Sequence, residues 1–243
     1  MKKLSLLALF LLVLLSCNST VKDNPKENSE DFVKTIDSES NSNDSTKKIL
    51  STTEAIAQAN GFNNWKNVKE IQFTFNVDRD SSHYDRTWKW RPKENLVTLL
   101  STKDTVEYNR TQMDSTALKV DPGFINDKYW LLAPYNLIWD ADSFTSTLQV
   151  NQIAPISKSK MQKLTIVYKN EGGYTPGDAY DFYFQGDFII KEWAFRKGNA
   201  PESSLITTWE DYKDFNGIKI AKTHNRNEGN WKLHFTGINV LTE

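Results

Sequence analysis

The sequence predicts a mainly β protein, built as a curved antiparallel meander with one apolar face. Over residues 49–243, most segments alternate apolar and polar side chains, which is the pattern of strands with one buried face. Short turn signals separate these segments, and short connections join antiparallel strands because a parallel pair needs a long crossover. Helix signals, in contrast, are few.

The first residues are typical of a targeting segment. A short basic start, Met1-Lys2-Lys3, precedes an apolar run from Leu4 to Leu15. At about 1.5 Å per helical residue this run would extend only about 18 Å, whereas the hydrocarbon core of a bilayer is about 30 Å thick. We therefore expect residues 1–16 to be a signal peptide.

The chain has a single cysteine, Cys17, directly after this run. Leu14-Leu15-Ser16-Cys17 resembles the lipobox of bacterial lipoproteins, in which the cysteine is acylated and the chain is cut before it. The resemblance implies that acylated Cys17 attaches the protein to a membrane of the cell envelope, because two or more acyl chains anchor stably. By similarity to Gram-negative sorting, Asn18 in place of aspartate favours the outer membrane. The alternative is a chance cysteine after an ordinary signal.

Residues 17–48 are expected to form the lipidated N-terminus and a disordered tether. Among residues 18–48 the clearly apolar ones are Val21, Phe32, Val33 and Ile36. Such a segment buries too little surface to offset its ordering entropy, and as a flexible coil it would extend about 30 Å. A short helix around Phe32 to Ile36 is the alternative. Residues 49–243 are then enough for one antiparallel β domain with a core.

Two segments of this domain predict helices. Residues 53–59 begin with a plausible cap at Thr53 and end near Asn60-Gly61. Residues 126–133 begin with Asn126 or Asp127 as a cap and are expected to stop at Pro134, which cannot continue a helix.

The remaining segments predict strands. Their alternating apolar residues are Ile71, Phe73, Phe75 and Val77; Trp88 and Trp90; Leu164, Ile166 and Tyr168; Tyr180, Phe182 and Phe184; Ile189 to Phe195; Ile218 and Ile220; and Trp231, Leu233 and Phe235. The turn signals are Glu171-Gly172-Gly173, Gln185-Gly186-Asp187, Asn216-Gly217 and Glu228-Gly229-Asn230. The apolar face must be covered by closure of the sheet, by a second sheet, or by curling around something else.

The whole order of segments resembles the lipoprotein-localisation carrier (LolA/LolB-like) superfamily over residues 50–243. More narrowly, Asn126-Asp127-Lys128-Tyr129-Trp130-Leu131-Leu132-Ala133-Pro134, Trp209-Glu210-Asp211-Tyr212 and Asn216-Gly217-Ile218-Lys219-Ile220 resemble a related family of bacterial envelope lipoproteins. The resemblance implies an incomplete antiparallel barrel with one or two short helices on its concave side. It also implies a cavity for acyl chains, and it brings no catalytic residue.

Residue patterns of catalysis, metal binding and nucleic-acid binding are weak. The sequence has no nucleophile elbow, zinc-protease motif, P-loop, dinucleotide fingerprint or Cys-x-x-Cys, so we expect neither an enzyme nor a cofactor. The balance of 30 basic and 31 acidic residues argues against nucleic-acid binding.

Two arrangements of polar residues remain to be weighed. His224 and His234 could meet across a hairpin and bind a metal with Glu228, but two surface histidines are the ordinary explanation. The carboxylate pairs Asp140/Asp142 and Glu210/Asp211 are more typical of solvated charges than of acid/base catalysis.

Aromatic residues are the remaining indication of function. We expect a hydrophobic pocket lined by Phe73, Phe75, Trp88, Trp90, Trp130, Leu132, Phe182, Phe184, Trp193 and Trp209. In this prediction Trp130 covers the face that carries Trp88 and Trp90. Two functions follow: binding of an acyl chain or other lipid in the concavity, or, if these residues are only core, docking of another envelope protein.

Overall fold

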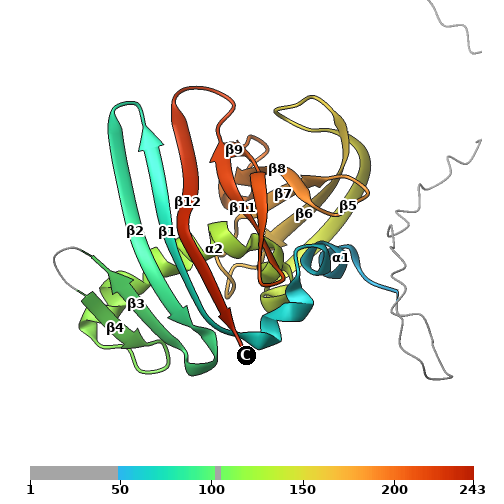
Figure 1. Ribbon diagram of the computed structural model, residues 1–243. Coiled ribbons are helices and arrows are strands. Elements are labelled where there is room, and N and C mark those ends of the chain that lie inside the picture. The colour runs from blue at the N-terminus through green and yellow to red at the C-terminus, as the bar shows by residue number, and fades with distance from the viewer. Residues whose placement is uncertain (1–48, 102–104) are drawn as a thin grey trace, which may run out of the picture.

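A computed structural model describes residues 49–101 and 105–243; Cys17, the signal peptide and the tether lie outside the described residues. Two antiparallel sheets dominate it (Figure 1). The seven-stranded sheet has the order β10 (Glu210–Phe215), β11 (Ile218–Asn225), β12 (Trp231–Thr242), β1 (Val68–Arg79), β2 (Ser82–Arg91), β3 (Leu96–Leu100) and β4 (Thr105–Asn109). The five-stranded sheet has the order β5 (Phe144–Ile153), β6 (Lys160–Tyr168), β7 (Ala179–Phe184), β8 (Ile190–Arg196) and β9 (Leu205–Thr208). The predicted mainly β, antiparallel class is therefore confirmed.

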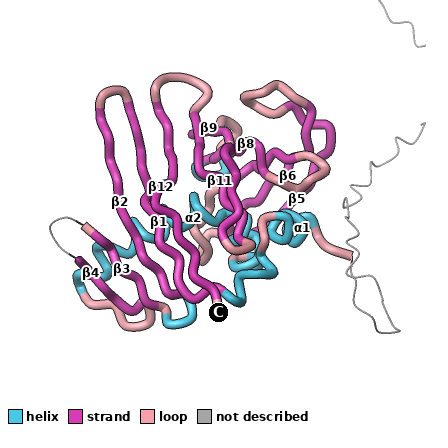
Figure 2. The backbone as a smooth tube through the Cα atoms, viewed as in Figure 1, coloured by secondary structure: helices cyan, strands magenta, loops and turns pink. Residues whose placement is uncertain are grey.

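The two sheets stay open, and the long helix covers their apolar sides. The strand orders end at β10 and β4 in one sheet and at β5 and β9 in the other, and a single bridge, between Thr207 and Arg226, joins the sheets among the described residues. The second helix, α2 (Ser115–Trp139), runs behind the long strands toward the five-stranded sheet (Figure 2). One hydrophobic core joins α2 to both sheets. A second sheet and a helix, rather than closure, thus cover the apolar face.

The alternating segments form the strands that they predict. Ile71 pairs with Trp90 and Phe73 pairs with Trp88 across β1 and β2, and all four side chains are buried. The predicted turns lie between β6 and β7, β7 and β8, β10 and β11, and β11 and β12. The sequence does not predict strands β3, β4, β5, β9 and β10. Strand β5 alternates only weakly, because most of its residues are exposed.

The first helix, α1 (Thr52–Ala59), confirms the predicted helix but corrects its cap. Ser51, and not Thr53, caps it: the Glu54 amide donates to Ser51 Oγ (3.3 Å), and the Ser51 amide donates to the Glu54 carboxylate (2.9 Å). This reciprocal pair is a capping box. After the helix, Gly61 has φ +91° and lies against the carbonyl of Gly217, so a β-carbon at this position would clash with backbone.

The helix predicted at 126–133 is wrong at both ends, because α2 covers 25 residues and contains two prolines. Asp114 caps it by accepting from the amides of Thr116 (2.9 Å) and Ala117 (2.8 Å). Pro134 distorts the helix without ending it: Leu132 has φ −129° and ψ 32°, and the Asn136 side-chain amide donates to the Leu132 carbonyl (3.3 Å). A side chain thereby supplies a donor to a carbonyl at the kink.

In the part of the chain that the structure describes, four short 3₁₀ helices complete the fold: η1 (Phe62–Asn67), η2 (Pro92–Glu94), η3 (Ala141–Ser143) and η4 (Lys197–Asn199). None of the helices within residues 49–101 and 105–243 combines the length and the apolarity that crossing a membrane requires.

Candidate functional site

An aromatic pocket lies between α2 and the five-stranded sheet. Its volume is about 260 Å³. It is lined by Asn126, Trp130, Tyr174, Thr175, Tyr180, Trp193, Phe195 and Leu205. These residues come from α2, from the loop between β6 and β7, and from β7, β8 and β9. The pocket therefore forms only when three separate parts of the chain pack together.

Ring contacts fix the walls of this pocket. Tyr174 stacks on Tyr129 of α2, with ring centroids 3.8 Å apart and an angle of 8° between the planes. Trp130 and Trp193 lie 4.4 Å apart, and Tyr180 lies 5.3 Å from Trp193. Such contacts give the large rings of the walls defined positions in the ligand-free protein.

A glycine brings Tyr174 to its place. Gly173 has φ +74°, and a β-carbon there would clash with the ring of Tyr168. The loop can pass this close to β6 only because residue 173 has no side chain. The next residue, Tyr174, then reaches α2 and covers one side of the pocket.

The polar groups of the pocket are uncharged. The Tyr174 hydroxyl donates to Asn126 Oδ1 (2.9 Å), and the hydroxyls of Thr175 and Tyr180 share a hydrogen bond of 2.9 Å. Burial raises the pKa of both Tyr174 and Tyr180 well above the ordinary value of 10.0, so both phenols stay neutral at physiological pH. The lining contains no Asp, Glu, Lys, Arg or His. The pocket is suited to an uncharged group.

A hydrogen-bond chain connects the pocket to the seven-stranded sheet. Asp127, fully buried, accepts from Arg86 Nε (2.8 Å), Arg86 Nη2 (2.6 Å) and Trp88 Nε1 (2.8 Å). Asn126 Nδ2 donates to the same carboxylate (2.9 Å), while Asn126 Oδ1 accepts from Tyr174. The carboxylate thus ties α2 to β2 and orients the amide that holds Tyr174.

Behind the pocket wall, four rings form a closed cycle. Trp130 contacts Trp193 at 4.4 Å, Trp193 contacts Trp209 at 5.3 Å, Trp209 contacts His224 at 4.5 Å, and His224 contacts Trp130 at 5.3 Å. All four side chains are buried. Trp130 and Trp193 belong both to this cycle and to the pocket lining.

The structure brings only two of the predicted pocket residues, Trp130 and Trp193, to this cavity. The other eight lie in the packed interior: Phe73, Phe75, Trp88, Trp90, Leu132, Phe182, Phe184 and Trp209. The expectation that Trp130 covers the face that carries Trp88 and Trp90 is also wrong. Phe124, one turn and a half before Trp130, contacts both rings, at 5.6 and 5.5 Å. Trp130 contacts Trp193 instead, because this part of α2 has reached the five-stranded sheet.

Sequence reasoning missed six lining residues: Asn126, Tyr174, Thr175, Tyr180, Phe195 and Leu205. Tyr180 and Phe195 belong to alternating segments that predict strands, so the alternation already predicts that their side chains point to the buried face. Tyr174 follows a glycine pair, and a large ring after two glycines is a weak signal of a loop that folds back. No local pattern marks Asn126 or Leu205 as part of a cavity.

The histidines do not lie as expected. His224 is not a surface residue: it is fully buried, and its Nδ1 lies 3.2 Å from the Thr208 carbonyl. Burial lowers its pKa from 6.5 to about 3. His83 and His234 instead approach Asp78, at 2.7 and 3.4 Å. Within the described part of the chain, no group of three or more His, Cys, Asp or Glu side chains is arranged to hold a metal ion.

The carboxylate pairs are engaged in ordinary contacts. Asp140 accepts from the Tyr168 hydroxyl (3.0 Å), and Lys169 donates to the backbone carbonyl of Asp142. Glu210 accepts from the Asn225 side-chain amide (3.2 Å), and Asp211 pairs with Lys222 (2.9 Å). The carboxylates of Asp140, Glu210 and Asp211 each contact a different group, and Asp142 is contacted through its backbone carbonyl, so the geometry does not form an acid/base pair.

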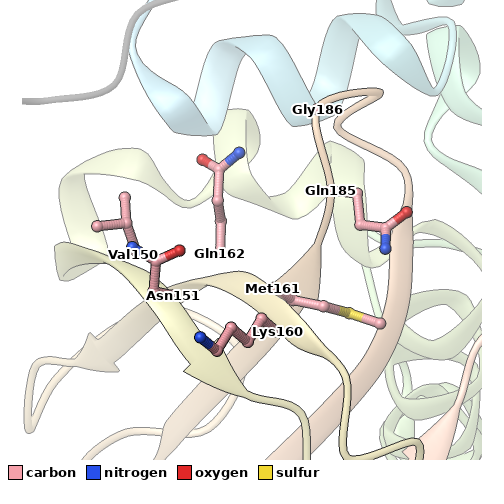
Figure 3. A pocket seen from close by; sticks show the side chains of 7 residues that line it. All are labelled: Val150, Asn151, Lys160, Met161, Gln162, Gln185 and Gly186. Atoms are coloured by element: carbon pink, nitrogen blue, oxygen red, sulfur yellow. The ribbon is translucent and has the colours of Figure 1, made fainter.

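Two other cavities are poorer candidates. A cavity of about 330 Å³ at the edge of the five-stranded sheet is lined by Val150, Asn151, Lys160, Met161, Gln162, Gln185 and Gly186 (Figure 3). Its side chains are mainly polar, and Val150 is 52% exposed. A cavity of about 620 Å³ beside β2 and β3 is lined by similarly accessible groups, including Tyr84, which is 50% exposed. The aromatic pocket is the better-enclosed apolar site.

Comparisons with known proteins give structural likeness alone. No protein-family model matches the sequence, and no curated protein matches it. A DUF1329 family protein from Desulfovibrio piger has a TM-score of 0.43 and 9% identity, covering 78% of this chain and 91% of that chain. A LolA superfamily protein from Nitrosomonas europaea has a TM-score of 0.47 and 10% identity, covering 80% and 96%. A domain assigned to outer membrane lipoprotein-sorting proteins, from Vibrio parahaemolyticus, has a TM-score of 0.42 and 12% identity, covering 77% and 91%. At such low identity no residue role transfers to this chain.

Proposed function

We propose that this protein is a lipid-anchored cell-envelope protein that binds a hydrophobic ligand, such as an acyl chain or another lipid, in the aromatic pocket. The observation that carries the proposal is the cavity itself: an uncharged space of about 260 Å³ with walls of tyrosine, tryptophan and phenylalanine. An apolar ligand that enters it leaves water without having to displace a charged group. The role is binding and not catalysis.

The volume of the cavity limits the size of the ligand that it can bind. Pockets for drug-sized ligands measure about 300–1,000 Å³, and this one, at about 260 Å³, is slightly smaller. It suits one ring or a short length of chain, with the remainder of the ligand outside. Leu205 and Tyr174, both partly exposed, lie at its rim. A lipid held in this way keeps part of its surface accessible to a membrane or a protein.

The anchor is proposed from the N-terminal sequence. Leu14-Leu15-Ser16-Cys17 supports acylation of Cys17, and the polar residues 18–48 support a tether between the lipid and the domain of residues 49–243. Asn18 supports placement in the outer membrane. The membrane is then the first partner of this protein.

The binding proposal is tested by tryptophan fluorescence during titration with ω-brominated acyl probes of increasing length. Bromine quenches nearby indoles, and Trp130 and Trp193 line the cavity. Affinity should rise about fourfold per methylene, from about 0.8 kcal/mol each, until the cavity is filled, and then level off. Leu205→Arg places a charge at the rim and should abolish quenching without unfolding the protein. Leu241→Arg is the matched control, because Leu241 is 47% exposed on β12. Equal quenching in both variants would exclude this pocket.

A second candidate function, docking of another envelope protein, is supported by β5. This strand is an outer edge of its sheet and carries no charged residue and no proline over ten residues. Natural edge strands usually carry such residues, which prevent pairing with other chains. Val150 and Ile153 on β5 are 52% and 55% exposed. The double substitution Thr147→Lys/Val150→Lys on β5 should then abolish cross-linking to a partner protein in the envelope. Unchanged cross-linking would exclude β5 as the docking surface.

A further inference from the structure

Three ring nitrogens of the four-ring cycle have no hydrogen-bond partner among residues 49–101 and 105–243. They are Nε1 of Trp193, Nε1 of Trp209 and Nε2 of His224. Their side chains are 1%, 3% and 0% exposed. Buried polar atoms are nearly always paired, so three unpaired ones in contacting rings require an explanation. They lie directly behind the pocket, because Trp193 lines it and also contacts Trp209.

The chemistry of the three nitrogens differs. An indole N–H can only donate, so Trp193 and Trp209 each lack an acceptor. His224 Nδ1 faces the Thr208 carbonyl at 3.2 Å, and a carbonyl can only accept. Nδ1 therefore carries the proton of the neutral ring, and Nε2 is left with a lone pair that lacks a donor. The cycle thus presents two donors and one acceptor.

A single hydroxyl group complements this set. Its oxygen accepts from the two indoles, and its hydrogen is donated to His224 Nε2. A carboxylate accepts from the indoles but meets the lone pair of Nε2 with a negative charge. An ammonium group donates to Nε2 but leaves both indoles without an acceptor. The phosphate of a phospholipid fails in the same way as the carboxylate.

We propose that the ligand of the aromatic pocket is a neutral amphiphile with a free hydroxyl, and that Trp193, Trp209 and His224 bind this hydroxyl. The inference rests on the proposed function, since the hydroxyl enters by way of the pocket. The ligand class is that of long-chain alcohols and partly acylated glycerols, and not that of free fatty acids. The rings of Trp130 and Trp193 separate the pocket from Trp209 and His224, so they move apart slightly when the hydroxyl enters.

The test compares two probes that differ only in their polar end. The full-length protein is titrated with decanol brominated at carbon 6, close enough to the hydroxyl to stay near Trp193, and with the matching 6-bromodecanoate at about pH 8, where the carboxylic acid is ionised, and tryptophan quenching is followed. We expect the alcohol to bind about tenfold more tightly, because the acid leaves an acceptor facing its charge. In His224→Leu the alcohol should lose this advantage, and the acid should bind no more weakly than to the native protein, because the acceptor that faced its charge is gone. His224→Gln, which restores a side-chain acceptor, should recover part of the preference and serves as the second variant if His224→Leu does not fold.

Each outcome separates this inference from the proposed function. Equal binding of both probes, unchanged in His224→Leu but abolished by Leu205→Arg, would overturn the hydroxyl site and retain the hydrophobic pocket. The three nitrogens would then be paired with a buried water or with neighbouring rings. No quenching by either probe would overturn the proposed function as well. An alcohol preference that persists in both His224 variants would place the hydroxyl elsewhere and would also refute the site.

Discussion

Replacing His224 with leucine should remove a defined part of the pH dependence of stability. The imidazole is fully buried between Trp130, Trp209 and Phe235. Burial lowers its pKa from 6.5 to about 3. In the unfolded chain the same ring accepts a proton below its ordinary pKa, so between these values the unfolded state binds more protons. The free energy of unfolding must therefore fall as the pH falls below about 6.5.

The magnitude follows from the two values. At about pH 5 the unfolded ring is largely protonated and the folded ring is not, so His224 contributes a loss of about 2 kcal/mol relative to pH 7. For a domain of this size, 1 kcal/mol shifts the thermal midpoint by about 2–4 °C. The midpoint of the native protein should thus fall by about 4–8 °C more than that of His224→Leu over this interval.

Thermal unfolding followed by circular dichroism at pH 7, 6 and 5 measures this difference. His83→Gln is the matched control: His83 is 54% exposed, and its replacement leaves His224 unchanged, so the part of the fall that His224 causes should remain in this variant. The same pH dependence in the native protein and in His224→Leu would refute a buried neutral His224.

Three further predictions concern the anchoring of α2, the packing of α1 and the lipid anchor. Asp127→Ala leaves Arg86 and Trp88 without their acceptor and should lower the free energy of unfolding in denaturant by about 3–5 kcal/mol. The control is Glu94→Ala, which removes an exposed ion pair with Arg91 and should lower it by less than about 1 kcal/mol. Gly61→Ala should lower the thermal midpoint strongly, because the added methyl group meets the Gly217 carbonyl. Gly186→Ala should leave the midpoint nearly unchanged, because the space around Gly186 is open. Similar effects of the two substitutions would contradict the packing of α1. Cys17→Ala should abolish acylation, and continued labelling with a clickable palmitate analogue would contradict the lipobox.

The strand-rich fold could be predicted because its signals are local. Trp88 and Trp90 alternate with Lys89 and Arg91, and the structure buries the two tryptophans while the two charged side chains stay partly exposed. The same reasoning fails for α2, because Pro134 predicts a helix end at a position where the helix continues. A proline removes one donor and crowds the preceding turn, but the Asn136 side chain and the distorted Leu132 accommodate it. That compensation depends on tertiary packing, which a local pattern does not contain.

The candidate site could be predicted only in part. Trp130 and Trp193 were identified because they are large and apolar, yet the same criterion selected Trp88, Trp90 and six other residues of the packed core. A cavity exists where three segments meet without filling the space between them. Tyr174 belongs to it because Gly173 allows the loop to reach Tyr129. Such long-range fits are invisible in the spacing of residues along one strand.

Photo-cross-linking tests the central claim most directly. The full-length protein is incubated with a long-chain alcohol that carries a diazirine on its chain, irradiated, digested and mapped by mass spectrometry. Binding in the aromatic pocket predicts adducts on residues 126–130, 174–175 and 193–205, and predicts their loss in Leu205→Arg but not in Leu241→Arg. Adducts confined to exposed surfaces such as β5, or equally abundant in both variants, would contradict it.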